Sequence, residues 1–144
     1  MQTLMQNKRI KRIIHTVFIA APAELYIFWL AWFAGGWGVL LSTNPDIFNA
    51  TKSYYVLRDI STNPTVWLLV YGGVSLFTLY ALFTKKKKLL MSSAMLMTLL
   101  WTFTAVALFI PSGIFNTGQF VYGTFALFAA WSYLRVANHS YTEI

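Results

Sequence analysis

Glu24 is the single carboxylate inside an apolar stretch of this sequence, and its position invites a chemical explanation. An ionised carboxylate in hydrocarbon costs at least about 2.5 kcal/mol. Such a group faces other helices, takes up a proton, pairs with a cation or lies at the membrane surface. Arg135, near the end of the last apolar stretch, is the candidate partner for an intramembrane polar pair. The pair indicates either a proton or ion relay or a structural contact, and we prefer the structural contact.

No other residue pattern points to catalysis or metal binding. The sequence has no cysteine, which excludes disulfides, thiolate nucleophiles and thiolate metal ligands. His15 and His139 lie near opposite ends of the chain. Paired carboxylates, a nucleophile elbow, a phosphate-binding glycine loop and a metal-ligating helix motif are all missing from the sequence. We therefore predict a protein that is not an enzyme and has no cofactor and no metal.

The composition predicts a chain that lies in a membrane. Of the 144 residues, 58% are hydrophobic and 10% are charged, whereas soluble domains carry roughly 25% charged residues. A helix needs about 20 apolar residues to cross a bilayer. Four stretches meet or approach that length, at about 17–41, 66–83, 89–110 and 119–136. We predict an all-α, integral membrane four-helix bundle that forms a single transmembrane domain over 1–144.

The distribution of charge predicts the orientation of this bundle. The formal net charge is +7, and all but two of the 11 lysine and arginine residues fall on one side of the predicted spans. The positive-inside rule then puts the N-terminus and the C-terminus in the cytoplasm. Basic residues at span ends suit anionic lipid better than nucleic acid, so we expect no nucleic-acid partner. The candidate lipid headgroup contacts are Lys8, Arg9, Lys11, Arg12, Lys85, Lys86, Lys87 and Lys88.

Residues 42–65 form the longest polar segment and lie outside in this topology. Asn44-Pro45-Asp46 is a turn signal, and a short interfacial helix is predicted around Tyr54 to Ile60. The four charged side chains have mixed signs and are interpreted as ordinary loop solvation. They are Asp46, Lys52, Arg58 and Asp59. Any recognition at the outer face would fall to this segment.

Small and aromatic residues within the spans predict how the helices meet. Glycines let neighbouring backbones approach closely, and the candidates are Gly35, Gly36, Gly38, Gly72, Gly73 and Gly123. Trp37, Trp67 and Trp131 lie near predicted span ends, as interfacial tryptophans do. The aromatic residues around Trp29 and Trp101 would stack a lipophilic ligand or, in the interpretation we prefer, pack helices and face lipid.

From about Pro22 onward the sequence contains a series of short motifs in a particular order. They are Gly35-Gly36-Trp37-Gly38, Phe48 with Ser53-Tyr54, Trp67, Trp101, Tyr122 and Trp131-Ser132-Tyr133-Leu134-Arg135. This order resembles a group of small, uncharacterised four-span membrane proteins encoded by tailed bacteriophages. The resemblance implies a phage-encoded protein in a bacterial inner membrane or a virion, and it implies no activity.

Three functions remain open at this point. The first is a non-enzymatic membrane or virion component that acts by association with the lipid bilayer, with copies of itself as a homo-oligomer, or with another membrane protein. The second is a holin-like pore former. The third is a small transporter or an accessory subunit of a membrane complex. A transporter needs a polar path, and the sequence offers only Glu24, Ser75, Thr78, Thr98, Thr102 and Thr104 for it.

Overall fold

The computed structural model describes residues 23–112 and 117–138, and the regular structure in these ranges is all helical. Each of the four long helices is long and apolar enough to cross a membrane. A helix of 21 residues spans about 31 Å, close to the thickness of a hydrocarbon layer. The prediction of a four-helix bundle is confirmed. The helices are α2 (Ala23–Thr43), α5 (Pro64–Thr84), α6 (Lys87–Ser112) and α7 (Thr117–Asn138).

The observed helix bounds extend the predicted spans by one or two residues at the described ends. α5 begins at Pro64 because Asn63 caps it: the Thr65 backbone N–H donates to the Asn63 side-chain oxygen at 2.9 Å. Proline suits the first turn, where its missing N–H has no helical partner. α5 ends at Thr84, and the C-cap residue Lys85 adopts a left-handed conformation with φ 51°. Residues 17–22 of the predicted first span lie outside the described residues.

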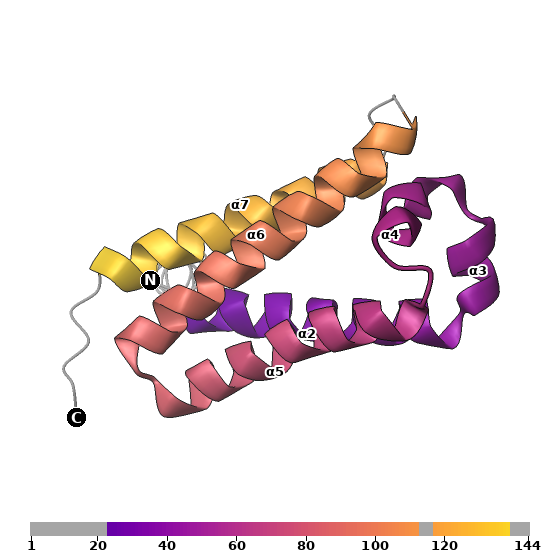
Figure 1. Cartoon of the computed structure of the whole chain (residues 1–144). Helices are drawn as coiled ribbons and strands as arrows, with labels where there is room; N and C mark the ends of the chain where they lie inside the picture. The colour runs from indigo at the N-terminus through magenta and orange to yellow at the C-terminus, as the bar shows by residue number, and fades with distance from the viewer. Residues whose placement is uncertain (1–22, 113–116, 139–144) are drawn as a thin grey trace, which may run out of the picture.

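Three short helices fill the polar segment between α2 and α5. They are α3 (Pro45–Ala50), the 3-10 helix η2 (Lys52–Tyr54) and α4 (Tyr55–Ile60). We call residues 45–60 the helical cap. Sequence patterns predicted one short helix near Tyr54 to Ile60, and the structure adds α3 and η2 to it. The cap lies at one end of the bundle, and the turn between α5 and α6, at residues 85–86, lies at the other. We call the end with the cap the cap end and the end with the turn between α5 and α6 the lysine end (Figure 1).

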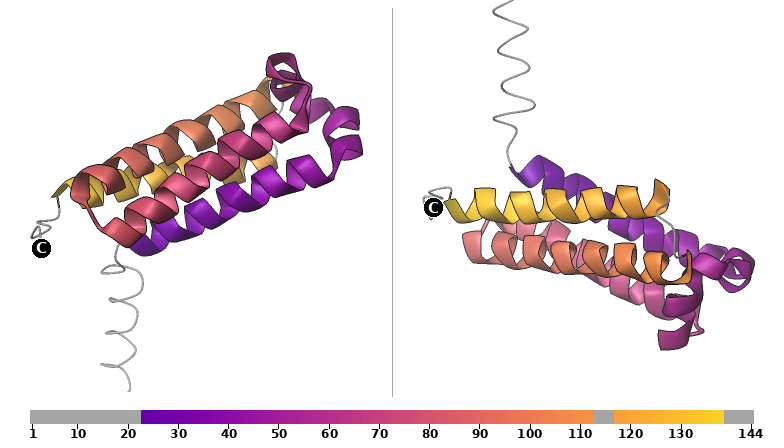
Figure 2. Two further views of the ribbon diagram at one scale, coloured as in Figure 1. Left: turned by 60° about the horizontal axis from the view of Figure 1, so that its bottom comes forward. Right: turned by 90° about the horizontal axis from the view of Figure 1, so that it is seen from above.

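The long helices form two antiparallel hairpins. α2 packs most closely on α5, and α6 packs most closely on α7, while the contacts between the hairpins are fewer. In Figure 1 the hairpins draw apart toward the cap end, where α4 lies beside α6. The two further views in Figure 2 show the same four-helix layout from other sides. A cap that is linked in sequence to the first hairpin thus rests on the second.

The core divides into a cluster at each end of the bundle. The cluster at the lysine end joins small and aliphatic side chains such as Ala23, Ile27 and Leu90. The larger cluster contains the aromatic residues Trp67, Tyr71 and Trp101 and continues into the cap. Buried alanines recur in both clusters, which fits helices that associate by close packing within a membrane.

The exterior of the long helices is apolar. Phe83 is 87% exposed, Leu127 72% and Leu69 70%. Many further large apolar side chains on all four long helices are exposed as well. Monomeric soluble proteins rarely expose apolar surface on this scale. The exterior, like the helix lengths, is that of a membrane protein.

Two of the predicted packing glycines lie where helices approach closely. A Cβ atom at Gly38 would lie 3.1 Å from Tyr71 Cβ and 3.3 Å from Leu68 Cα, so α2 and α5 nearly touch there. At Gly35 it would lie 3.0 Å from Ser75 Oγ. That space lets the Ser75 hydroxyl donate to the Ala31 carbonyl oxygen of α2 at 2.7 Å.

The other four glycines do not bring helices together within the described chain. A Cβ atom at Gly36, Gly73 or Gly123 would meet no described atom within 4 Å, and one at Gly72 would meet only Leu68 of its own helix, at 4.0 Å. For these four the structure shows no close approach of another helix among the described residues.

Candidate functional site

The helical cap is held together by Arg58. Its guanidinium group donates to the carbonyl oxygens of Phe48 at 2.5 Å and Thr51 at 2.8 Å. Phe48 lies in the last turn of α3, where backbone carbonyls lack partners within the helix, and Thr51 is the C-cap residue that follows α3. The interpretation of Arg58 as an ordinary solvated loop charge is therefore wrong. A charged donor that binds two carbonyls fixes α4 against α3.

Buried side chains seat the cap on the bundle. Phe48 and Leu57 are fully buried, and Tyr54 stacks on Phe48 with ring centroids 5.9 Å apart. Tyr54 also meets Trp37 of α2 edge-on at 6.2 Å. Burial raises the pKa of the Tyr54 hydroxyl above its ordinary value of 10.0. Its contribution to folding is complete below pH 10 and is lost as the pH rises through the raised pKa, because the unfolded state ionises first.

The cap also presents apolar side chains to its surroundings. Ile47 is 53% exposed, Tyr55 54% and Ile60 60%. Its four charged residues carry no net charge, since Lys52 and Arg58 offset Asp46 and Asp59. Exposed apolar residues on an ordered, neutral element are suited to contact with lipid headgroups or with another protein.

An aromatic core lies beneath the cap and connects all four long helices. Trp101 of α6 stacks on Tyr122 of α7 with centroids 5.7 Å apart and an interplanar angle of 3°. Trp37 of α2 lies 5.2 Å from Tyr122, and Tyr71 of α5 lies 6.2 Å from Trp101. Among the described residues, the indole N–H of Trp101 is buried without a hydrogen-bond partner. Sequence patterns suggested helix packing for Trp101, and this is how the structure uses it.

Trp67 differs from its prediction as an interfacial residue. It is 4% exposed, stacks on Phe103 at 6.1 Å and donates its indole N–H to the Ser61 carbonyl oxygen at 3.3 Å. The side chain therefore connects the start of α5 to α6 and to Ser61, which directly follows the cap.

Polar side chains inside the bundle make hydrogen bonds between helices or back to their own helix. The Tyr71 and Thr104 hydroxyls lie 2.7 Å apart and join α5 to α6. The Gln119 amide of α7 donates to the Leu108 carbonyl oxygen of α6 at 3.0 Å. Thr78 and Thr98 each bond the carbonyl four residues earlier, while Thr102 is exposed. The hydroxyl of Tyr71 and the amide of Gln119 therefore connect neighbouring helices, and those of Thr78 and Thr98 are bonded to their own helices.

Glu24 and Arg135, the predicted polar pair, both lie at the lysine end. Glu24 is half-buried in the first turn of α2. Arg135 is exposed in the last turn of α7 and places its guanidinium over the Trp131 ring, 5.2 Å from the centroid. The structure thus puts a cation-π contact on Arg135 that the sequence did not reveal. The contact between Glu24 and Arg135 stays a prediction.

A groove runs between α2 and α5 at the lysine end. Its volume is about 530 Å³. Glu24 and Lys85 line it together with the apolar side chains Leu25, Phe28, Leu79, Leu82 and Phe83. Sequence reasoning could not foresee that Glu24 and Lys85 share one groove, because their proximity follows from the pairing of α2 with α5.

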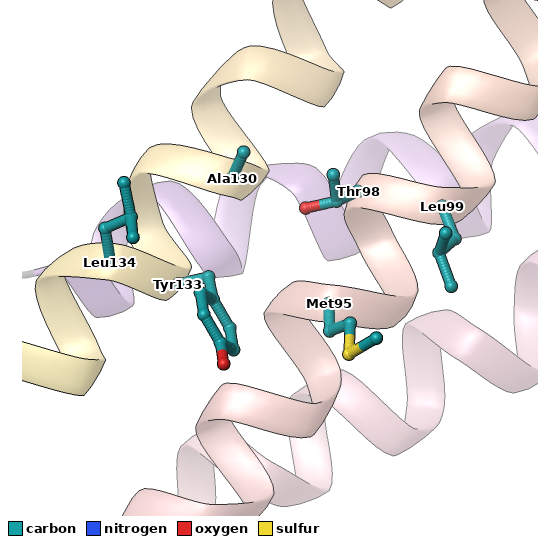
Figure 3. Close-up of a pocket in the computed structure, with 6 residues that line it drawn as sticks. All are labelled: Met95, Thr98, Leu99, Ala130, Tyr133 and Leu134. Atoms are coloured by element: carbon teal, nitrogen blue, oxygen red, sulfur yellow. The ribbon is translucent and has the colours of Figure 1, made fainter.

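A second groove, of about 430 Å³, lies between α6 and α7 and is shown in Figure 3. Its polar side chains are Thr98 and Tyr133, and the Thr98 hydroxyl already bonds the Ala94 carbonyl oxygen. Met95, Leu99, Ala130 and Leu134 complete the lining. No charged residue lines it, so it offers van der Waals contact and little chemistry.

The basic residues predicted to meet lipid headgroups fall into two sets. Lys85 and Lys86 connect α5 to α6, whereas Lys87 and Lys88 begin α6. Lys85, Lys86 and Lys88 are exposed at the lysine end. Lys8, Arg9, Lys11 and Arg12 lie outside the described residues. In the described ranges no group of three or more histidine, aspartate or glutamate side chains is placed to hold a metal ion.

Comparison with known proteins adds no relative. No protein-family model, curated protein or solved structure matches this chain. The cap, the aromatic core and the lysine-end groove are therefore interpreted from their own geometry.

Loss of the Arg58 guanidinium loosens the cap. We expect Arg58→Gln to cost the cap about 1.5–3 kcal/mol, the contribution of hydrogen bonds from a charged group. Amide hydrogen exchange over residues 45–60 should accelerate by about tenfold or more. Lys52→Gln removes an exposed cation from the same cap and should leave exchange unchanged. Equal protection in wild type and Arg58→Gln would contradict this role.

Proposed function

We propose that this chain is a non-enzymatic membrane protein that acts by association through its helical cap. The observation that carries the proposal is an ordered cap with exposed Ile47, Tyr55 and Ile60, mounted on an aromatic core. The interior polar groups form hydrogen bonds within the bundle, which favours a bundle that supports the cap over one that forms a polar channel. Such a bundle has little internal freedom and presents the cap in a fixed position.

The orientation in this proposal puts the cap outside and the lysine end in the cytoplasm. The cap end carries no net charge over residues 45–60, whereas the lysine end carries Lys85 to Lys88 and Arg135. The positive-inside rule favours this arrangement. The resemblance to four-span proteins of tailed phages is the sole support for a phage-encoded component in a bacterial inner membrane or virion.

Photocrosslinking in the membrane of the producing cell tests the association. A photoreactive residue at Ile60, in the cap, should give one discrete adduct with a protein partner or a second copy of the chain. The same residue at Leu127, which is exposed on α7, should give lipid adducts only. Arg58→Gln should remove the Ile60 adduct, and Lys52→Gln should retain it.

Two results would overturn the proposal. One is an Ile60 adduct pattern no different from that at Leu127, which would leave the cap without a partner. The other is collapse of the membrane potential when the chain is produced, which a holin-like pore would cause and an association protein would not.

A further inference from the structure

The turn between α5 and α6 is fixed by backbone hydrogen bonds on both sides and contains one strained residue. The Lys85 N–H donates to the Ala81 carbonyl oxygen, and the Leu90 N–H donates to the Lys86 carbonyl oxygen, each at 3.0 Å. Among the described residues, Lys85 is the one non-glycine residue with a positive φ, at 51°. A left-handed backbone costs free energy at every residue type with a Cβ atom, and glycine is the usual choice just after a helix end. The turn would therefore form more easily with glycine at position 85.

Positive charge is concentrated in the same turn. Lys85, Lys86 and Lys88 are exposed, and like charges so close together repel one another. Lys88 also lies in the first turn of α6, where the positive end of the helix dipole disfavours a cation. Backbone strain and charge repulsion thus act on the same few residues.

The chain cannot neutralise this turn with its own carboxylates. α5, α6 and α7 contain no aspartate or glutamate. Of the four carboxylate side chains in the sequence, Asp46 and Asp59 lie in the cap at the opposite end. The other two, Glu24 and Glu143, are outnumbered by the four lysines at 85–88. An excess of positive charge therefore remains at the lysine end, and a partner from outside the chain that matches it is an anion.

The turn lies where the apolar surface of α5 ends. Phe83, which is 87% exposed, comes only two residues before Lys85. A lysine at such a boundary extends its ammonium to the level of the lipid phosphates while its stem stays on apolar surface. Anionic phospholipids attract basic residues held at this level. A phosphate that is joined to acyl chains therefore suits the turn better than a free anion does.

We infer that the turn between α5 and α6 is a binding surface for anionic phospholipid, with Lys85, Lys86 and Lys88 as the headgroup contacts. The lipid phosphates offset the repulsion among the three ammonium groups. Position 85 loses ease of turn formation and gains a charge at the headgroup level. This inference is independent of the proposed function of the cap, since it concerns the opposite end of the bundle.

Native mass spectrometry of the full chain in detergent, titrated with dioleoyl phosphatidylglycerol or dioleoyl phosphatidylcholine, tests the inference. Wild type should bind phosphatidylglycerol more tightly. Each of Lys85→Gln, Lys86→Gln and Lys88→Gln should lower that affinity by about two- to fivefold, the contribution of one basic residue near an anionic surface. The triple variant should bind the two lipids about equally. Lys52→Gln removes an exposed cation from the cap and should change neither affinity.

Two substitutions at position 85 separate the charge from the backbone. Lys85→Gln removes the ammonium and keeps the strained backbone, whereas Lys85→Gly removes both. The two variants should lose the same factor in phosphatidylglycerol affinity. The equilibrium constant for unfolding should be about fivefold smaller in Lys85→Gly than in Lys85→Gln. Reversible unfolding in zwitterionic mixed micelles measures this difference, and circular dichroism establishes that each variant is folded.

Four outcomes would overturn the inference. Equal binding of the two lipids by wild type would mean ordinary surrounding lipid only. A preference for phosphatidylglycerol that survives the triple replacement would place the contacts on other basic residues. Affinities that differ between Lys85→Gly and Lys85→Gln as much as their stabilities do would assign the effect to the shape of the turn. Displacement of phosphatidylglycerol by an equal concentration of inorganic phosphate would make the turn a site for free anions.

Discussion

Replacing Trp101 by alanine lowers the free energy of unfolding by about 3 kcal/mol. The indole is 1% exposed and contacts Tyr71, Tyr122 and Phe125, three of the rings that fill the core beneath the cap. Removing a buried tryptophan side chain costs about 3–5 kcal/mol in soluble proteins. We expect the lower end of that range because lipid, unlike water, gives no large transfer term and packing remains as the main loss. Reversible unfolding in mixed micelles measures the difference.

Trp101→Phe is the matched control for that substitution. Phenylalanine retains much of the ring contact and removes the buried indole N–H, which has no partner among the described residues. An unsatisfied buried donor costs about 1–3 kcal/mol, so its removal offsets part of the lost volume. We expect Trp101→Phe to cost less than half of what Trp101→Ala costs. Equal losses in the two variants would show that the ring contacts do not stabilise the bundle.

Gly38→Val separates α2 from α5 and destabilises the chain by about 3 kcal/mol. The first added carbon already lies 3.1 Å from Tyr71 Cβ and 3.3 Å from Leu68 Cα. A backbone atom cannot rotate away, so the helices must move apart, and overpacking costs about 1–3 kcal/mol even before the two valine methyls are counted. Unfolding in mixed micelles and loss of the monodisperse elution profile both report the effect.

Gly36→Val provides the comparison on the same helix. Nothing described lies within 4 Å of the added Cβ atom, and surface substitutions of this kind change stability by about 0.5 kcal/mol or less. A destabilisation of Gly36→Val as large as that of Gly38→Val would mean that valine disturbs α2 itself. The close approach of α2 to α5 would then not be the cause.

The four long helices could be predicted because apolar length and low charge are properties of each segment alone. Which glycine contacts a neighbouring helix could not be predicted. Gly38 lies on the face of α2 that meets α5, whereas Gly36 does not, and this difference depends on how the helices pair. Trp67 likewise lies near a span end in sequence, yet the approach of α6 buries it. In each case the missing information is the pairing of helices.

The helical cap shows the same limit for polar residues. Arg58 and Lys52 are equivalent in sequence, as cations in a polar segment with mixed charges. Only the folded cap brings the Phe48 and Thr51 carbonyls within reach of Arg58. Glu24 was singled out by its type, but its neighbour in the groove is Lys85, a residue more than fifty positions away.

The seating of the cap on α6 makes the cap a clamp between the two halves of the molecule. Its chain connections run to α2 and α5, whereas η2 and α4 rest on α6. Any partner that binds the cap therefore binds an element that is joined to the first hairpin in sequence and packed on the second, at the end where the hairpins diverge.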